Sequence, residues 1–301
     1  MTIMASDWGK ALVEGVHLFW DQHQNNLKTQ YTKLFDISTS RKHYEEIVAT
    51  TGMGLARVRA PGAAVEMDQE RQFYITRFQH VEYALGFAIS HILVDDDLYD
   101  VAAARKTKNL HMSMALTKET VAHNVINRAT NSSYLGGDGV TLLSTAHLYG
   151  DGSTYANKPS TDVGLSAVAL EDAHIAIMKY KNNAQLTAPV NPVSLHIPPD
   201  LVHKAARITK SMYKPGSADN DINTIESLGL FPGGVHVHHF LTDTDQWTIK
   251  TDANDGLMFF ERTPVKFGQT AEWDTDVAKF KAAERYSVGW GNPRAVYGST
   301  G

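Results

Sequence analysis

The feature that most constrains the fold is a stretch from residue 95 to about residue 130 that contains neither proline nor glycine. Apolar residues recur in it at helical spacing, namely Leu98, Val101, Met112, Leu116, Ala122 and Ile126. The aspartates at 95–97 suit a helix N-cap and the positive end of the helix dipole. The Asn- and Gly-rich segment after residue 130 supplies a stop. We therefore predict one long helix.

A single helix over this stretch would be roughly 50 Å long. A compact protein of this size has a radius of gyration of only about 19 Å, and the mean helix has about a dozen residues. Such a helix needs an equally long element to lie along. The alternative is two ordinary helices that are broken near residues 106–109.

Composition bounds the class of protein. The 301 residues are 43% hydrophobic and 20% charged, with a net charge of −5 and no cysteine. This is an ordinary soluble composition, with room for a substantial core and about two domains. Without cysteine there is no disulfide, thiolate nucleophile or thiolate metal site. We expect no secretory signal and no membrane span. The mild acidity argues against nucleic-acid binding through a broad basic surface, but not against enclosing nucleic acid.

Two helices are predicted before the long one. Residues 8 to about 35 have an aromatic stripe at helical spacing, which packs either on its own core or on a neighbouring subunit. Residues 40–50 predict a shorter helix with Ser40 as its N-cap.

Between residues 55 and 90 the pattern predicts two long extended segments around a turn. Residues 73–80 alternate with a period of two, which is typical of a strand. The distal part has too few apolar residues for a core strand and is crowded with charges, namely Arg57, Arg59, Glu66, Asp68, Glu70 and Arg71. Because an isolated two-stranded arm is marginal in water, we expect a neighbouring subunit to cover it. The alternative is a hairpin that lies flat on its own domain.

The second half predicts a mixed α/β region. A long loop reaches residue 162, Ser166 caps a helix, and a strand at 193–197 precedes a helix with Pro199 in its first turn. Further strands are predicted at 235–241, 246–251, 256–262 and 277–290, followed by an open tail. The predicted class is α+β, with sheet segments from distant parts of the sequence.

The most tempting chemistry lies in His236 and His238, which would share one face of a strand and could bring two imidazoles to one metal. A third ligand is needed, and His239 would face the other way. A half-exposed strand with histidines is the simpler interpretation. The chain has no GxxxxGK[ST], HExxH or GxSxG motif. We therefore expect no cofactor, metal or catalytic residues, and a protein that is not an enzyme.

Several segments, taken in order, resemble the major capsid proteins of tailed bacteriophages, whose fold is shared with herpesvirus capsids and encapsulins. The resemblance covers about residues 35 to 301. The segments are SRKHYEEIVATTGMG, the charged extended hairpin, YALGFAISHILVDDDLYD entering the long helix, LLSTAHLYGDGSTYANKPSTDVGLSAVALEDA, PVSLHIPPDLVHKAARI and NPRAVYGSTG.

The resemblance implies the architecture. It implies an N-terminal arm (1–53), an extended loop (54–90), a peripheral domain with the long spine helix (91–139 and 251–301) and an axial α/β domain (140–250). Subunits would self-assemble as hexamers and pentamers into an icosahedral head. This shell would enclose viral double-stranded DNA without sequence-specific binding, in a virion assembled in the host cytoplasm. The six charged residues of the extended loop would contact an adjacent subunit, with Arg57, Arg59 and Arg71 opposite its carboxylates.

The resemblance also implies partners. They are other copies of the chain, a portal and a separate scaffolding protein, with a decoration protein as an optional addition and no membrane. A separate scaffold is expected because the chain lacks the long charged helical leader of some members. Some members cross-link neighbours through a lysine on the extended loop, but no lysine lies between Lys42 and Lys106. The alternatives are an encapsulin-like cellular shell that holds cargo and a small metalloenzyme that uses His236, His238 and a third ligand.

Overall fold

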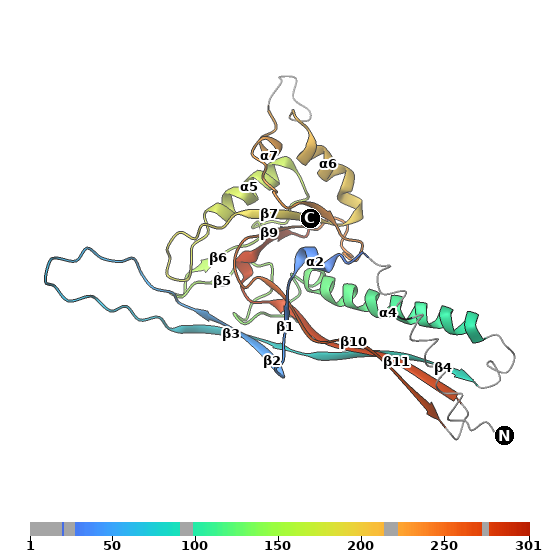
Figure 1. Cartoon of the computed structure of the whole chain (residues 1–301). Coiled ribbons are helices and arrows are strands. Elements are labelled where there is room, and N and C mark those ends of the chain that lie inside the picture. The colour runs from blue at the N-terminus through green and yellow to red at the C-terminus, as the bar shows by residue number, and fades with distance from the viewer. Residues whose placement is uncertain (1–19, 21–27, 91–98, 214–221, 273–276) are drawn as a thin grey trace, which may run out of the picture.

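The computed structural model describes residue 20 and residues 28–90, 99–213, 222–272 and 277–301. Two four-stranded sheets and one long helix organise this part of the chain, and a thin hairpin projects beyond them (Figure 1). Each sheet combines strands that are distant in sequence, which confirms the predicted α+β class. Within the described ranges, no helix has the length and apolarity needed to cross a membrane.

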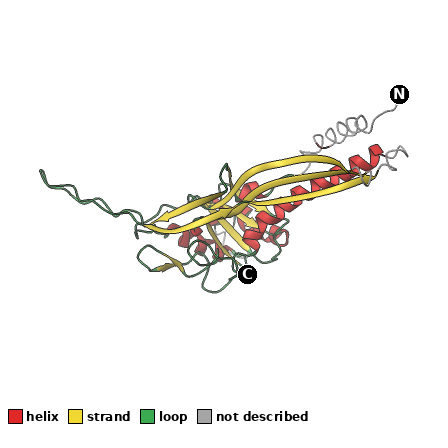
Figure 2. Ribbon diagram, turned by 90° about the horizontal axis from the view of Figure 1, so that it is seen from below, coloured by secondary structure: helices red, strands yellow, loops and turns green. Residues whose placement is uncertain are grey.

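The first sheet has the strand order β1-β10-β11-β4. Its strands are β1 (Asp36–Thr39), β10 (Leu257–Glu272), β11 (Val277–Trp290) and β4 (Val81–Ser90). β11 pairs antiparallel with both β10 and β4, whereas β1 runs parallel to β10. Figure 2 shows the long strands side by side, with helix α4 running along them. These strands are the long partner that the helix requires.

Helix α4 spans Tyr99–Asn127 without interruption and is therefore about 43 Å long. The single-helix prediction is confirmed, the alternative of a break near 106–109 is wrong, and residues 95–97 lie outside the described residues. The apolar residues that recur at helical spacing are not all buried, because Met112 and Leu116 are 37% and 39% exposed. Three polar residues, Thr107, Glu119 and His123, are buried instead. The positions of apolar residues alone therefore do not identify the buried face of α4.

The second sheet has the order β12-β9-β7-β8. Its strands are β12 (Val296–Ser299), β9 (Trp247–Thr251), β7 (Pro192–Ile197) and β8 (Gly234–Val237). Helices α5 (Ala167–Met178), α6 (Val202–Lys210) and α7 (Thr224–Ser227) share one core with it, and the turn η1 (Pro199–Leu201) leads into α6. Ser166 caps α5 as predicted, its Oγ accepting from the N–H of Ala169 at 3.1 Å. β5 (His147–Leu148) and β6 (Thr154–Tyr155) form a small separate pair.

The predicted open tail is wrong. A short turn, η2 (Pro293–Ala295), leads into β12, whose four residues are all buried. The small residues of this segment permit close packing, since a Cβ on Gly298 would lie 2.7 Å from the carbonyl oxygen of Trp247. Residues 296–299 therefore belong to the second sheet, whereas β10 and β11 of the same range, 251–301, belong to the first.

The projecting hairpin is formed by β2 (Tyr44–Thr50) and β3 (Gln72–Gln79), which pair antiparallel. The helix predicted at 40–50 is therefore wrong, and Ser40 bonds Glu45 and the N–H of Lys42 instead of capping a helix. The predicted alternation in 73–80 is confirmed. β3 pairs with β2, while β4 joins the first sheet through β11.

The predicted N-terminal helix over residues 8–35 lies mostly outside the described residues. Its last part contains only a single turn, α2 (Tyr31–Leu34). Trp20 is 3% exposed and stacks on Phe267 of β10, with ring centroids 5.0 Å apart. The sequence left open whether this segment packs on its own core or on a neighbouring subunit. Trp20 packs on its own chain.

Candidate functional site

The six charged residues selected from the sequence all lie in residues 51–71, here called the distal loop, which continues the β2–β3 hairpin beyond its strands (Figure 1). Contacts join its two limbs at matched distances from the tip. The N–H of Thr51 donates to the carbonyl of Arg71 at 2.9 Å, and the N–H of Gly54 donates to Asp68 Oδ2 at 2.7 Å. The limbs therefore run alongside each other without a regular strand ladder.

Closer to the tip, Arg57 Nη1 lies 3.1 Å from Glu66 Oε1. Both side chains are largely exposed, at 79% and 69%, so this ion pair contributes at most about 1 kcal/mol. Arg59 Nε donates to the carbonyl of Ala63 across the turn. Arg57 thus pairs within its own hairpin, and Arg59 is held at the tip.

The distal loop also exposes large apolar side chains. Every residue from 53 to 71 is exposed, and the exposed fractions of Leu55, Val58, Val65 and Met67 are 77%, 103%, 61% and 88%. Apolar side chains gathered in one exposed segment mark a protein contact surface. The rest of the described chain leaves this surface in water.

The root of the hairpin, in contrast, is fixed to the body of the protein. Tyr74 Oη donates to the carbonyl of Gly291 at 3.3 Å, and Asn183 Nδ2 donates to the carbonyl of Thr50 at 2.7 Å. Burial raises the pKa of Tyr74 to about 12, so its hydroxyl keeps the donated proton at neutral pH.

A glycine and an aromatic pair complete this attachment. A Cβ on Gly137 would lie 2.3 Å from Thr76 Oγ1 and 2.8 Å from the carbonyl oxygen of Ile75, so only glycine fits against β3. Phe78 is 4% exposed and meets Phe260 edge to face, with centroids 5.1 Å apart. The hairpin therefore has a rigid root and an uncovered tip.

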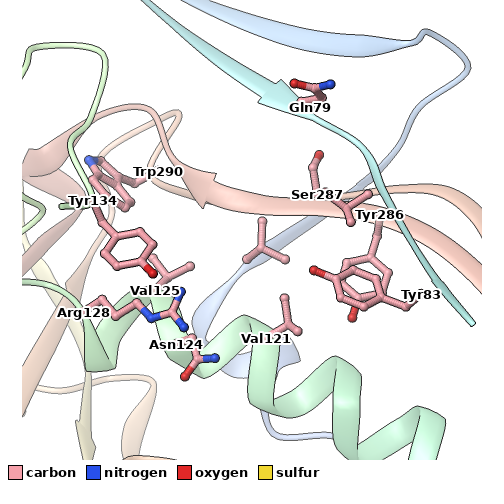
Figure 3. Close-up of a pocket in the computed structure, with 12 residues that line it drawn as sticks. Gln79, Tyr83, Val121, Asn124, Val125, Arg128, Tyr134, Tyr286, Ser287 and Trp290 are labelled. Atoms are coloured by element: carbon pink, nitrogen blue, oxygen red, sulfur yellow. The ribbon is translucent and has the colours of Figure 1, made fainter.

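A pocket of about 230 Å³ opens where β3 passes into β4 (Figure 3). The Arg128 guanidinium lies 4.4 Å from the centroid of the Tyr134 ring, and Tyr83 stacks on Tyr286 at 4.7 Å. The remaining lining residues are Gln79, Val81, Val121, Asn124, Val125, Ser287, Val288 and Trp290. Small-molecule sites usually have volumes of about 300–1,000 Å³. This pocket suits a side chain better than a cofactor.

The two candidate metal ligands, His236 and His238, lie in different environments. His236 is half-buried on β8, with its ring centroid 5.3 Å from that of His196. His238 follows β8 and is 1% exposed, so the prediction of a half-exposed strand is wrong there. Both of its ring nitrogens are hydrogen-bonded, Nε2 to His196 Nδ1 at 2.7 Å and Nδ1 to His123 Nε2 at 2.8 Å. Among the residues that the structure describes, no three His, Asp or Glu side chains form a metal-binding group.

Sequence reasoning missed the partners of His238, because 115 and 42 positions separate it from His123 and His196 and no local pattern connects them. It also gave no weight to the apolar residues of the distal loop. Val58, Val65 and Met67 stand among charged residues in a segment already predicted to lie outside the core. That combination was a usable signal for a contact surface.

Comparison with known proteins identifies a family that matches most of the chain. The phage capsid protein family, described as "Phage capsid protein", matches residues 74–299. No curated protein matches the chain.

Solved structures share the fold. The capsid of the cyanophage P-SCSP1u is 12% identical with a TM-score of 0.55, and the match covers 90% of this chain and 87% of that chain. The capsid of a native GTA particle is 14% identical with a TM-score of 0.54 and 90% coverage of both chains. A virus-like particle from Pyrococcus furiosus is 13% identical with a TM-score of 0.51, covering 95% of this chain and 98% of that chain. With most of its length matched by the family and its fold shared with phage capsids, the chain belongs to the phage capsid protein family.

Proposed function

We propose that this protein is the major capsid protein of a tailed bacteriophage, which self-assembles as hexamers and pentamers into the icosahedral head around the viral double-stranded DNA. The observation that supports this most is the distal loop, whose apolar side chains are left in water while its root is fixed. In a member of a capsid family, the natural cover for such a segment is another copy. Heterologous contacts of this kind, repeated around a ring, close it.

Within this proposal, Arg57, Arg59, Glu66, Asp68, Glu70 and Arg71 form the charged part of the contact. The first sheet with α4 corresponds to the peripheral domain and the second sheet with α5 to α7 to the axial domain. The protein is structural and has no catalytic role. Its other partners are a scaffolding protein, a portal and optionally a decoration protein. It assembles in the host cytoplasm and resides in the virion, enclosing DNA without reading its sequence.

A cellular shell that holds cargo is the second candidate. The virus-like particle from Pyrococcus furiosus shares this fold over nearly the full length of both chains, and the fold alone does not separate a viral head from a cellular shell. Particle contents separate the two candidates. Nuclease-protected double-stranded DNA supports the viral head, whereas a co-purifying protein cargo without DNA supports the cellular shell.

Sedimentation velocity of the purified protein tests the shell itself. We expect a narrow species in the megadalton range, many times the 33.2 kDa of one chain. A 33 kDa species alone does not decide, because a capsid subunit can wait for its scaffold. A species that stays at this mass after co-expression with its scaffolding protein would contradict the proposal.

A further inference from the structure

A continuous chain of hydrogen bonds crosses the interior between the second sheet and α4. Ser194 Oγ lies 2.8 Å from His196 Nε2, and His196 Nδ1 lies 2.7 Å from His238 Nε2. His238 Nδ1 lies 2.8 Å from His123 Nε2, and His123 Nδ1 lies 2.7 Å from the carbonyl oxygen of Glu119. All of these side chains are at most 4% exposed. We call this set the histidine chain.

The carbonyl of Glu119 fixes the protons of the whole set. A carbonyl only accepts, so His123 Nδ1 must donate, and in a neutral ring Nε2 must then accept. The same reasoning passes through His238 to His196, whose Nε2 accepts from the Ser194 hydroxyl. One arrangement therefore satisfies every contact with all three imidazoles neutral, and each ring holds its proton on Nδ1.

Added protons strain this arrangement in two steps. One extra proton can be held without breaking a contact. His196 then carries a proton on Nε2 as well, and the Ser194 hydroxyl accepts from it instead of donating to it. A second extra proton places two N–H groups against each other across one of the two nitrogen–nitrogen contacts. That contact must then break, and water must enter to solvate the freed groups.

The histidine chain joins three parts of the protein. His196 lies on β7, His238 follows β8 and His123 lies on α4. The Glu119 carboxylate accepts from the N–H of Gln30 at 2.7 Å and of Tyr31 at 3.0 Å, at the start of α2. The Gln30 side chain also makes two hydrogen bonds with His239. Its Nε2 lies 2.7 Å from His239 Nδ1, and its Oε1 accepts from the backbone N–H of His239 at 3.0 Å.

The charges around the histidine chain mostly oppose protonation. Lys250 of β9 faces His196 and is paired with Asp36 at 2.9 Å, and Lys33 of α2 faces His236. His236 and His239 flank His238 on its own segment. On α4, the acidic side chain of Glu119 lies close by, with Oε2 at 3.5 Å from His123 Nδ1. Burial lowers the pKa of His123 and His196 and lowers that of His238 to about 3.

We propose that the histidine chain is an acid-operated latch, which holds the second sheet, α4 and the start of α2 together while it is neutral and releases them when protons enter. In the released state each imidazole regains an ordinary pKa of about 6.5. Below that pH the released state binds more protons than the closed state, so acid favours release. The closed state is fully stable above about pH 6.5 and loses stability as pH falls toward the low pKa values of the closed rings.

Hydrogen exchange followed by mass spectrometry tests the latch on the full chain, with rates corrected for the intrinsic effect of pH on exchange. Each proton taken up on release raises the released population about tenfold per pH unit below 6.5. We expect exchange of the segments containing α2 and β8 to rise at least tenfold per pH unit between pH 6.5 and 5. Exchange of residues 267–272 and 277–282, the paired ends of β10 and β11 that lie near the start of α4 and away from the histidine chain, should rise far less.

Two variants separate the latch from a general loss of stability. His238→Gln interrupts the histidine chain and removes one proton-binding group, so it should lower the slope of log exchange against pH in α2 and β8 by about one. His203→Gln removes an exposed imidazole on α6, outside the histidine chain and outside α2 and β8, and should leave the slope unchanged. An equal rise in all segments, or an unchanged slope in His238→Gln, overturns the proposal.

Nitrogen NMR of the unaltered protein with ¹⁵N-labelled histidine provides a test that needs no variant. At pH 7.5 three of the 14 histidines should be neutral with the proton on Nδ1, shielded from solvent exchange. Those three signals should disappear together as pH falls. Nε2 protonation of these rings, or titration of each ring alone at an ordinary pKa, would rule the latch out.

Discussion

Arg59 shows what a single residue can contribute at the tip of the distal loop. Its Nε holds the carbonyl of Ala63, and the side chain lies in water beside exposed Val58. We expect Arg59→Glu to reduce particle yield at least tenfold, because it reverses a charge in the proposed contact. The melting temperature of the unassembled subunit should stay within about 2 °C, since exposed sites change stability by only about 0.5 kcal/mol.

The matched control is Arg105→Glu, which makes the same change of charge at an exposed position on α4, away from the distal loop. Particle yield is counted by sedimentation after identical expression. Normal yield of Arg59→Glu, or an equal loss in both variants, would show that Arg59 has no part in assembly.

Lys118 illustrates a residue with a structural role inside the subunit. Its Nζ lies 2.7 Å from Glu284 Oε2 and 3.3 Å from Glu261 Oε1, and the Glu284 side chain is 1% exposed. Lys118→Met leaves a buried carboxylate without its partner, so we expect a loss of about 3–5 kcal/mol in the free energy of unfolding. Urea denaturation of the subunit measures this. Lys108→Met, at an exposed position of the same helix, should change it by no more than about 0.5 kcal/mol.

At the scale of elements, α4 is the feature on which the other parts depend. A proline at Asn109 lies at the position where a break between two helices was the alternative. In a continuous helix it removes a backbone hydrogen bond and clashes with the preceding turn, at a cost of about 3 kcal/mol or more. We expect Asn109→Pro to lose at least this much stability by urea denaturation, while Asn109→Ala loses none. Equal stability of the two variants would show that the helix is not continuous there.

The elements that the sequence predicts well have strong local signals. The Ser166 cap, the proline that opens η1 and the uninterrupted stretch of α4 each act within a few residues. The failures depend on contacts between distant segments. Residues 44–50 form a strand because β3 lies beside them, and residues 296–299 become buried because β9 does. No pattern within either segment contains that information.

The same distinction applies to the candidate sites. Charge density in a segment with few apolar residues located the distal loop correctly, although whether it contacts a neighbour stays a prediction. The histidine chain could not be found this way, because Glu119 and His123 of α4, His196 of β7 and His238 after β8 are brought together only by the tertiary fold. The pair His236 and His238 indicated where a cluster of histidines lies, but not that His238 is hydrogen-bonded to His123 and His196.

At the scale of the whole molecule, the composition of the distal loop determines how subunits are held. No lysine lies between Lys42 and Lys106, so the loop has no amine that could form an isopeptide bond with a neighbour. We expect purified particles, boiled in detergent, to run as one band near 33 kDa in denaturing electrophoresis. A ladder of covalent multimers would contradict this. Particles should therefore depend on non-covalent contacts and dissociate in concentrated guanidinium.

The order in which strands enter the two sheets has a consequence for synthesis on the ribosome. The first sheet needs β10 and β11, and the second needs β9 and β12, all of which lie after residue 246. At about 5–20 residues per second, translation of the preceding chain takes at least about ten seconds, during which neither sheet can close. A product that terminates before this point lacks strands of both sheets, so the topology alone prevents such a chain from completing either one.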